Sequence, residues 1–172
     1  NIKIFIFNDK SPQNIKGYNN EYLRKFNSKI NIVNRVKNLG FAKNFLLGLK
    51  DVGSKFDYYA FSDQDDIWEN NKIEIAIKEI RKLNSKKPVL YCSRTAYYSD
   101  NCSNEIGSSR NFKKKASFKN SLIQNIASGN TIVMNKKARN LVVSSLDCKE
   151  FIAHDWWCYQ IISASGGKII FD

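Results

Sequence analysis

The chain has 172 residues, of which 42% are hydrophobic and 13% aromatic, so it is long enough for one domain with a substantial core. This composition excludes a disordered tail, and no apolar run reaches the roughly 18 residues that a membrane-spanning helix needs. Lysine and arginine total 28 against 16 aspartates and glutamates, for a formal net charge of +12, which is compatible with an anionic partner but does not identify one.

Strand-like and helix-like segments alternate along the chain. Residues 2–7 favour a strand that ends before a polar turn. Further strands are predicted at residues 30–33, 57–61, 89–92, 131–134 and 168–171. Apolar spacing predicts helices at residues 18–26, 41–52, 73–83, 117–124, 136–146 and 154–163, the second of them with Phe41 on its apolar face. Residues 99–115 are polar, and we expect them to form a loop.

This order predicts an α/β sandwich with a mixed, mostly parallel sheet. Neither an internal repeat nor a linker interrupts it, so residues 1–172 are expected to form a single domain. Ligands of such sheets bind beyond the carboxyl ends of the strands, where loops and helix N-termini converge. Two of these positions are acidic, namely Asp9 and the segment Asp63–Asp66.

The acidic segment is the strongest chemical signal. Asp63, Asp65 and Asp66 directly follow an apolar strand, and their charges repel one another unless something neutralises them. Mg²⁺ in proteins is usually held by one or two carboxylates together with substrate phosphates. The segment therefore suits a divalent cation that bridges to a diphosphate. The alternative is a solvated acidic turn in which Asp66 caps the next helix.

A second candidate site is the sequence His154-Asp155-Trp156-Trp157 at the start of a predicted helix. A carboxylate between aromatic side chains and a helix N-terminus can serve as a general base, and tryptophans can stack on a sugar ring. The alternative is that Asp155 is simply an N-terminal helix residue and that both tryptophans belong to the core.

The four cysteines do not form a C-x-x-C pair, and His154 is the single histidine, so a zinc site is not expected. We predict that they are reduced thiols, as in the cytoplasm, with one opportunistic disulfide as the alternative. They are Cys92, Cys102, Cys148 and Cys158.

The tightest basic cluster is Lys113–Lys115, with Arg110 and Lys119 beside it. Elsewhere the basic residues are scattered through a sequence rich in Asn, Lys and Ile, a bias that codon usage can explain. We interpret the cluster as a solvated surface loop. Binding to lipid head groups or to a phosphorylated acceptor is the alternative.

These sites, in this order, resemble glycosyltransferase family 2, the inverting nucleotide-sugar transferases with the GT-A fold. The form of the H-D-W-W segment is similar to that of rhamnosyltransferase-like members. The resemblance extends over nearly the whole chain. It rests on I-F-N-D-K-S-P-Q, on Asn38-x-Gly40 followed by Asn44, on F-S-D-Q-D-D-I-W-E-N-N-K-I, on S-G-N-T-I-V-M-N-K-K-A, and on H-D-W-W.

The resemblance implies roles for the acidic residues. Asp9 would contact the nucleotide base, and Asp63 would contact the nucleotide sugar. Asp65 would ligate a Mn²⁺ or Mg²⁺ ion that bridges the donor diphosphate, with Asp66 in support. Asp155 would be the general base that takes the proton of the acceptor hydroxyl.

The resemblance also implies an acceptor side and a cellular setting. The partners would be a nucleotide-diphosphate sugar and a glycan or lipid-linked acceptor, with no nucleic acid, in cell-surface polysaccharide or glycoconjugate synthesis. The protein would work in the cytoplasm, at the inner face of the cell membrane. The residues implied on the acceptor side are Gly129, Asn130, His154, Trp156 and Trp157.

The chain also departs from the family pattern. Asn8 and Gln13 stand where the family often has aspartate, and Asn70 stands where a proline is common. The family's first strand and helix, which form one wall of the nucleotide pocket, precede the segment that resembles residues 2–7. We therefore expect a GT-A domain truncated at both ends and lacking its first strand.

Three alternative functions are also compatible with the sequence. The first is a degenerate, non-catalytic domain that binds nucleotide-sugars. The second is a metal-dependent nucleotidyl- or phosphotransferase, which could use the same acidic segment. The third is a nucleic-acid binder, which the net charge suggests although aromatic and basic residues do not interleave as such binders require.

Overall fold

The computed structural model describes residues 2–12, 25, 29–84, 86–147 and 150–172. Its main sheet has four strands in the order β3–β7–β4–β8. β7 pairs antiparallel with both β3 and β4, whereas β8 is parallel to β4, so three strands share one direction and β7 runs against them. This agrees with the predicted mixed sheet. The strands are β3 (Tyr58–Ala60), β4 (Val89–Cys92), β7 (Val133–Asn135) and β8 (Lys168–Phe171).

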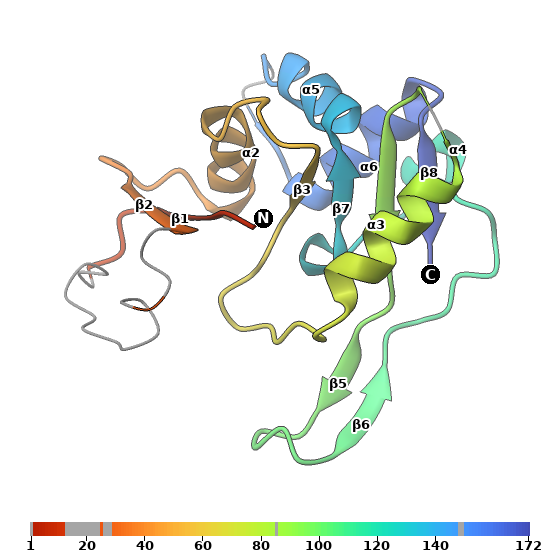
Figure 1. Ribbon diagram of the computed structural model, residues 1–172, viewed down its shortest axis with the longest axis horizontal. Helices are drawn as coiled ribbons and strands as arrows, with labels where there is room; N and C mark the ends of the chain where they lie inside the picture. Colours follow the sequence, from red (N-terminus) through yellow and green to blue (C-terminus); the bar gives the residue numbers. More distant parts are fainter. Residues whose placement is uncertain (1, 13–24, 26–28, 85, 148–149) are drawn as a thin grey trace.

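Helices cover both faces of this sheet (Figure 1). Alternate residues of β4 divide between two apolar clusters, with Leu90 in the larger one and Val89 in the smaller one. Buried residues of α2, α5 and α6 join the larger cluster, and α3 supplies residues to the smaller one. The helices are α2 (Phe41–Asp51), α3 (Lys72–Lys82), α5 (Lys136–Ser144) and α6 (His154–Ala164).

The first strands form a separate parallel pair beside α2, β1 (Ile4–Asn8) with β2 (Ile30–Asn34) (Figure 1). Gly48 of α2 lets this pair approach closely, because a Cβ there would lie 2.8 Å from a ring carbon of Phe7. The Asn44 amide Nδ2 donates to the Phe7 carbonyl at 2.8 Å. Asn44, the last residue of the predicted asparagine-glycine pattern, therefore binds α2 to β1, whereas Gly48 lies outside that pattern.

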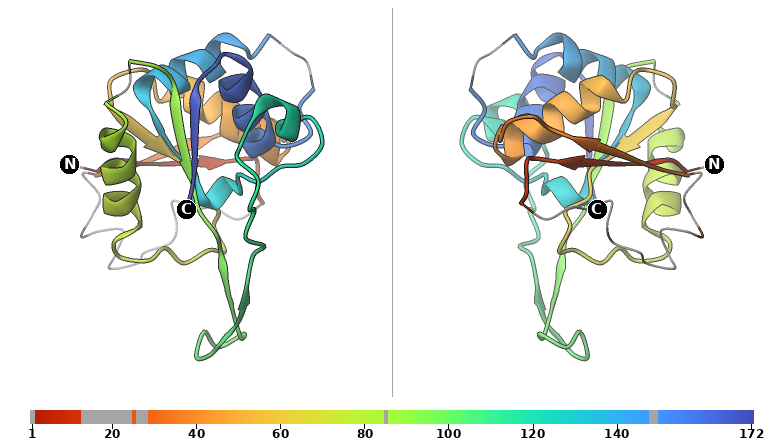
Figure 2. Two further views of the ribbon diagram at one scale, coloured as in Figure 1. Left: turned by 90° about the vertical axis from the view of Figure 1, so that its right-hand side faces the viewer. Right: turned by 90° about the vertical axis from the view of Figure 1, so that its left-hand side faces the viewer.

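A projecting hairpin corrects the prediction of a polar loop over residues 99–115. β5 (Ala96–Tyr98) and β6 (Glu105–Ser108) pair antiparallel and extend away from the main sheet (Figure 2). All three residues of β5 are exposed, so the hairpin lacks the alternating apolar and polar pattern by which strands are predicted.

Three further predictions concern the length of a helix, the burial of Phe41 and the segment at residues 18–26. α4 (Phe118–Ser121) is shorter than the helix predicted at residues 117–124, and the chain enters β7 through a 3₁₀ turn, η3 (Gly129–Thr131). Phe41 is 62% exposed, which corrects its predicted place on the buried face. The helix predicted at residues 18–26 falls almost wholly outside the described residues.

Candidate active site

A cleft of about 550 Å³ opens at the edge of the main sheet where β3, β4 and β8 end. Asp63 follows β3, Ser93 follows β4 and Phe171 ends β8, so the cleft lies where ligands of parallel sheets bind. Four of the predicted site residues meet here. They are Asp63, Asp66, Asn130 and Asp155.

The environment of Asp63 disfavours its ionised form. Its pKa is raised first by burial and then by the charges of Asp66, Asp65 and Asp155. Asp63 is half-buried, whereas Asp65 and Asp66 are exposed. Burial and neighbouring negative charges both disfavour the ionised form of Asp63. The cleft therefore favours a positively charged ligand near Asp63.

The acidic residues fit a cation that is shared with a substrate. Among the residues described, no three His, Cys, Asp or Glu side chains converge on a set that could hold a metal by themselves. Mg²⁺ does not require such a set, since one or two carboxylates and substrate phosphates are its usual ligands. A cation here would relieve the repulsion that raises the pKa of Asp63. The donor set thus suits a bridging ion and not a closed protein cage.

Asp155 lies in the first turn of α6 and on the wall of the same cleft. Its Oδ2 accepts a hydrogen bond from the Gly129 N–H at 3.0 Å, and its Oδ1 accepts one from the Trp156 N–H at 2.6 Å. Two backbone donors on different elements therefore orient this carboxylate. Each oxygen can still accept a hydrogen bond from a hydroxyl in the cleft.

The turn that carries Gly129 has no room for a larger residue. A Cβ at this position would lie 2.6 Å from Nε2 of His154. Gly129 itself is buried, whereas the neighbouring Asn130 lines the cleft. The predicted Gly-Asn start of β7 thus serves two purposes, since Gly129 reaches the Asp155 carboxylate and Asn130 reaches the cleft.

His154 packs into the core and not against the cleft. Its ring stacks on Phe45 at 4.2 Å between centroids and meets Phe61 edge-on at 4.9 Å. Neither ring nitrogen has a hydrogen-bond partner within the described parts of the chain. Burial lowers the pKa of His154 to about 4, against the opposing effect of Asp155. The imidazole is therefore neutral near pH 7, and its predicted acceptor-side contact gains no support from this geometry.

The two tryptophans fasten α6 to neighbouring elements. Trp156 Nε1 donates to the Ser121 carbonyl at 2.6 Å, and Trp157 Nε1 donates to Ser145 Oγ at 3.0 Å. Neither residue lines the cleft. Their position matches the alternative interpretation of core residues, and it offers nothing for the predicted stacking on a sugar.

Asp9 also has a structural task. Its Oδ1 accepts from the Leu39 N–H at 2.8 Å, and its carbonyl accepts from Asn38 Nδ2 at 3.1 Å. These bonds join the end of β1 to the turn before α2. Asp9 does not line the cleft, so its predicted contact with the nucleotide base stays a prediction.

Several residues of the cleft were not predicted. Tyr97 and Ser109 come from the hairpin and its base, and Arg110 is the one cation among the described residues that line the cleft. Arg110 had drawn attention only as a neighbour of the basic cluster, whose three lysines are exposed. The hairpin gave no sequence signal for Tyr97, so its place in the cleft follows from the tertiary structure alone.

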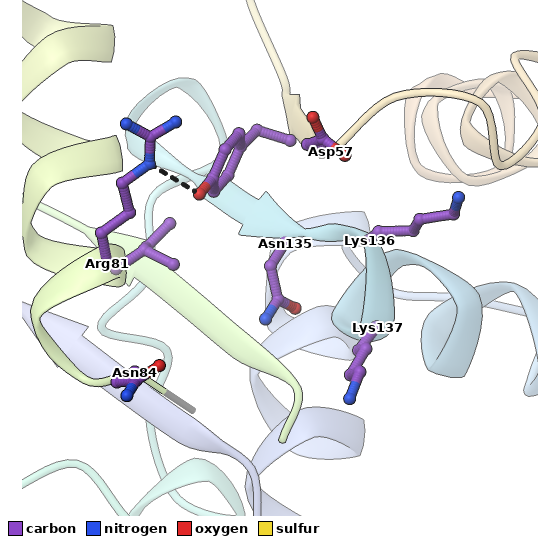
Figure 3. A pocket seen from close by; sticks show the side chains of 8 residues that line it. Asp57, Arg81, Asn84, Asn135, Lys136 and Lys137 are labelled. Carbon is purple, nitrogen blue, oxygen red and sulfur yellow. Dashed lines mark hydrogen bonds between the residues drawn. The ribbon is translucent and has the colours of Figure 1, made fainter. Parts of the chain in front are cut away.

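A second cavity, of about 370 Å³, lies at the opposite edge of the main sheet. Arg81, Lys136 and Lys137 surround it together with Asp57 (Figure 3). The register places it there, because Tyr58 at the start of β3 pairs with Asn135 at the end of β7. No predicted site residue lines this basic groove.

Comparison with known proteins agrees with the α/β fold. The model of glycosyl transferase family 2 matches residues 1–142, and the chain belongs to this family. The match includes the acidic segment Asp63–Asp66 and the Gly129 turn, and it ends before α6.

The chain is also similar to the dTDP-rhamnosyl transferase RfbG of Shigella flexneri. The two are 31% identical over 167 residues, which cover 92% of this chain. The chain spans about half of that relative, 55% of its length. The family match ends at residue 142, whereas this alignment covers 92% of the chain.

Two further predictions concern the cysteines and the membrane. Cys92, Cys102 and Cys158 are free thiols, and burial raises the pKa of Cys92 to about 12. Cys148 lies outside the described residues. Within the part of the chain that the structure describes, no helix is both long and apolar enough to cross a membrane.

Proposed function

We propose that this protein transfers a sugar from a nucleotide-diphosphate sugar to an acceptor hydroxyl, with inversion at the anomeric carbon. The observation that supports this most is the juxtaposition of Asp155 with Asp63 and Asp66 in one cleft. A base and a donor site must face the same reacting carbon, and here the electrostatic effect of Asp155 on Asp63 reflects their proximity.

In this mechanism Asp155 acts as the general base. The acceptor hydroxyl donates a hydrogen bond to a carboxylate oxygen, and its oxygen attacks the anomeric carbon as the proton passes to Asp155. The bond from that carbon to the diphosphate oxygen breaks, and the nucleoside diphosphate leaves with the electron pair. A single displacement of this kind inverts the anomeric configuration.

The Gly129 N–H keeps the carboxylate aimed into the cleft during this step. Asp65, with Asp63 and Asp66 beside it, would hold a Mn²⁺ or Mg²⁺ ion. When bound, the ion would supply positive charge for the leaving diphosphate. Asp63 would in addition contact the donor's nucleotide sugar.

The donor and acceptor classes follow from similarity. Because the relative is a dTDP-rhamnosyl transferase, we propose a deoxyhexose or hexose donor and a glycan or lipid-linked acceptor of a surface polysaccharide. The protein would meet such an acceptor at the cytoplasmic face of the membrane.

A double-label experiment tests the reaction class. The full-length protein is incubated with Mn²⁺ or Mg²⁺, an acceptor glycan and nucleotide-sugars that are labelled in the sugar or in the β-phosphate. We expect the sugar label in the acceptor and the phosphate label in the released nucleoside diphosphate. β-Phosphate label in the acceptor would indicate a phosphotransferase, and release of both labels together as sugar phosphate would indicate a nucleotidyltransferase. Binding without transfer or release of either label would indicate a non-catalytic domain.

A further inference from the structure

Lys72 connects two segments that are far apart in the sequence and that both contribute residues to the cleft. Its Nζ donates to the Asn130 carbonyl at 2.5 Å, and the same Nζ lies 3.3 Å from the ring centroid of Trp68. Asn130 belongs to the turn before β7, and Trp68 follows the acidic segment Asp63–Asp66. One ammonium group therefore contacts both of these segments.

Local structure does not explain why a lysine stands here. Lys72 is the first residue of α3, where the positive end of the helix dipole disfavours a cation. The side chain is half-buried, and burial lowers the pKa of Lys72 to about 8 although the charge of Asp66 acts in the opposite direction. The contacts with Trp68 and Asn130 compensate for these two unfavourable effects.

The turn that Lys72 contacts is the one that orients Asp155. Asn130 directly follows Gly129, and the Gly129 N–H donates to Asp155 Oδ2 at 3.0 Å. The Asn130 carbonyl shares a peptide unit with the Thr131 N–H, which donates at 2.9 Å to the Ser128 carbonyl, and that carbonyl shares a peptide unit with the Gly129 N–H. A displacement of the Asn130 carbonyl would therefore shift this N–H as well. The contacts thus run from Trp68 through Lys72 to the turn and on to the carboxylate.

We propose that Lys72 is a positioning residue, which holds the Gly129–Asn130 turn at a fixed place relative to the acidic segment and thereby aims Asp155 at the donor. This inference rests on the proposed function, because it assumes that Asp155 acts on a donor held near Asp63. Lys72 itself does not line the cleft, so we assign it a positioning role and not a catalytic one.

The test compares three variants of the full-length protein. Lys72→Met keeps an unbranched chain over Trp68 but removes the donor, Lys72→Arg keeps a charged donor, and Lys78→Met changes an exposed lysine of the same helix. For Lys72→Met we expect kcat to fall at least about tenfold while KM for the donor changes less than about threefold, as when a transition-state contact is lost. Lys72→Arg should recover most of kcat, and Lys78→Met should match the wild type.

Amide hydrogen exchange gives a readout that needs no activity. If Lys72 holds the turn, exchange at Gly129 should be at least about tenfold faster in Lys72→Met than in the wild type, with little change in α5. Unchanged exchange, or an unchanged kcat, overturns the proposal. If the wild type transfers no sugar at all, the proposed function fails, and exchange at Gly129 still decides whether Lys72 fixes the turn. If Lys72→Met does not fold, Lys72→Gln serves in the same two measurements.

Discussion

The cleft and the basic groove lie at opposite edges of one sheet and differ in charge. Three carboxylates and one cation line the cleft, whereas three cations and one carboxylate line the groove. The net charge of +12 thus describes the surface as a whole and not the site. Three of the 16 acidic residues meet in the cleft, where β3, β4 and β8 end.

The two regions also differ in what their charges do to stability. In the cleft, burial and then the charges of neighbouring carboxylates raise the pKa of Asp63, so its ionised form is disfavoured in the folded protein. In the groove, Arg81 Nε donates to Tyr58 Oη (Figure 3), and Lys137 Nζ donates to the Lys86 carbonyl. Carboxylates that repel one another are more typical of a functional site than cations whose hydrogen bonds are made within the protein.

The largest effect is expected for Asp155→Asn. Loss of the base should lower kcat by about 10²- to 10⁴-fold, with donor affinity nearly unchanged, because a base acts in the transition state. Asp57→Asn is the matched control, since it removes one carboxylate from the groove. Steady-state kinetics and calorimetric donor titration measure both quantities. Equal losses of kcat in Asp155→Asn and Asp57→Asn would contradict the assignment of catalysis to the cleft and not to the groove.

Asp63→Asn should weaken donor binding and at the same time stabilise the folded protein. We expect donor affinity to weaken by about tenfold or more, the usual effect of losing a hydrogen bond to a charged group. The raised pKa of Asp63 means that ionisation destabilises the folded protein, so the variant should melt at a higher temperature at pH 7. This gain should disappear as the pH falls and Asp63 takes up its proton. A lower melting temperature at pH 7 would contradict the electrostatic account.

His154 should make the protein sensitive to acid. With a pKa of about 4 when folded and 6.5 when unfolded, His154 takes up its proton first in the unfolded chain. Stability should therefore fall between pH 6.5 and pH 4, by at most roughly 3 kcal/mol. His154→Leu removes the titrating group, and urea unfolding across this range should then show a flatter dependence on pH. Parallel curves for the two proteins would exclude a buried neutral His154.

The smallest effect is expected in the groove. Lys136 is the first residue of α5, which has no acidic residue in its first turn. Lys136→Glu should stabilise the fold by about 0.3–1 kcal/mol through the helix dipole, with transfer activity within about twofold of the wild type. Lys136→Gln should give a smaller gain, and high salt should weaken both. A loss of activity in either variant would show that the groove takes part in the reaction.

The sequence predicted most elements of the main sheet because their apolar patterns are regular. The strand predicted at residues 168–171 matches β8, and the one at residues 89–92 matches β4. The hairpin escaped prediction because Tyr97, Tyr98 and Ile106 are all largely exposed, so no buried face imposes a period. Phe41 was misplaced because helical spacing assigns it to the apolar face, whereas it is the first residue of α2 and lies largely exposed there.

The candidate site was predicted in part for a similar reason. Position after a strand pointed correctly to the part of the cleft that holds Asp63 and Asp66. His154 and the tryptophans are next to Asp155 in the sequence, but successive helix residues face different directions, so they pack into the core while Asp155 faces the cleft. The bond from Gly129 to Asp155 joins distant segments, and no local pattern reveals it.

The anomeric configuration of the product tests the central claim most directly. The claim is that one base, Asp155, and one donor site share the cleft and support a single displacement. NMR coupling constants of the newly formed linkage, compared with those of the donor sugar, report whether the configuration has changed. We predict inversion in every product molecule. Retention would require a second displacement and would contradict the role proposed for Asp155.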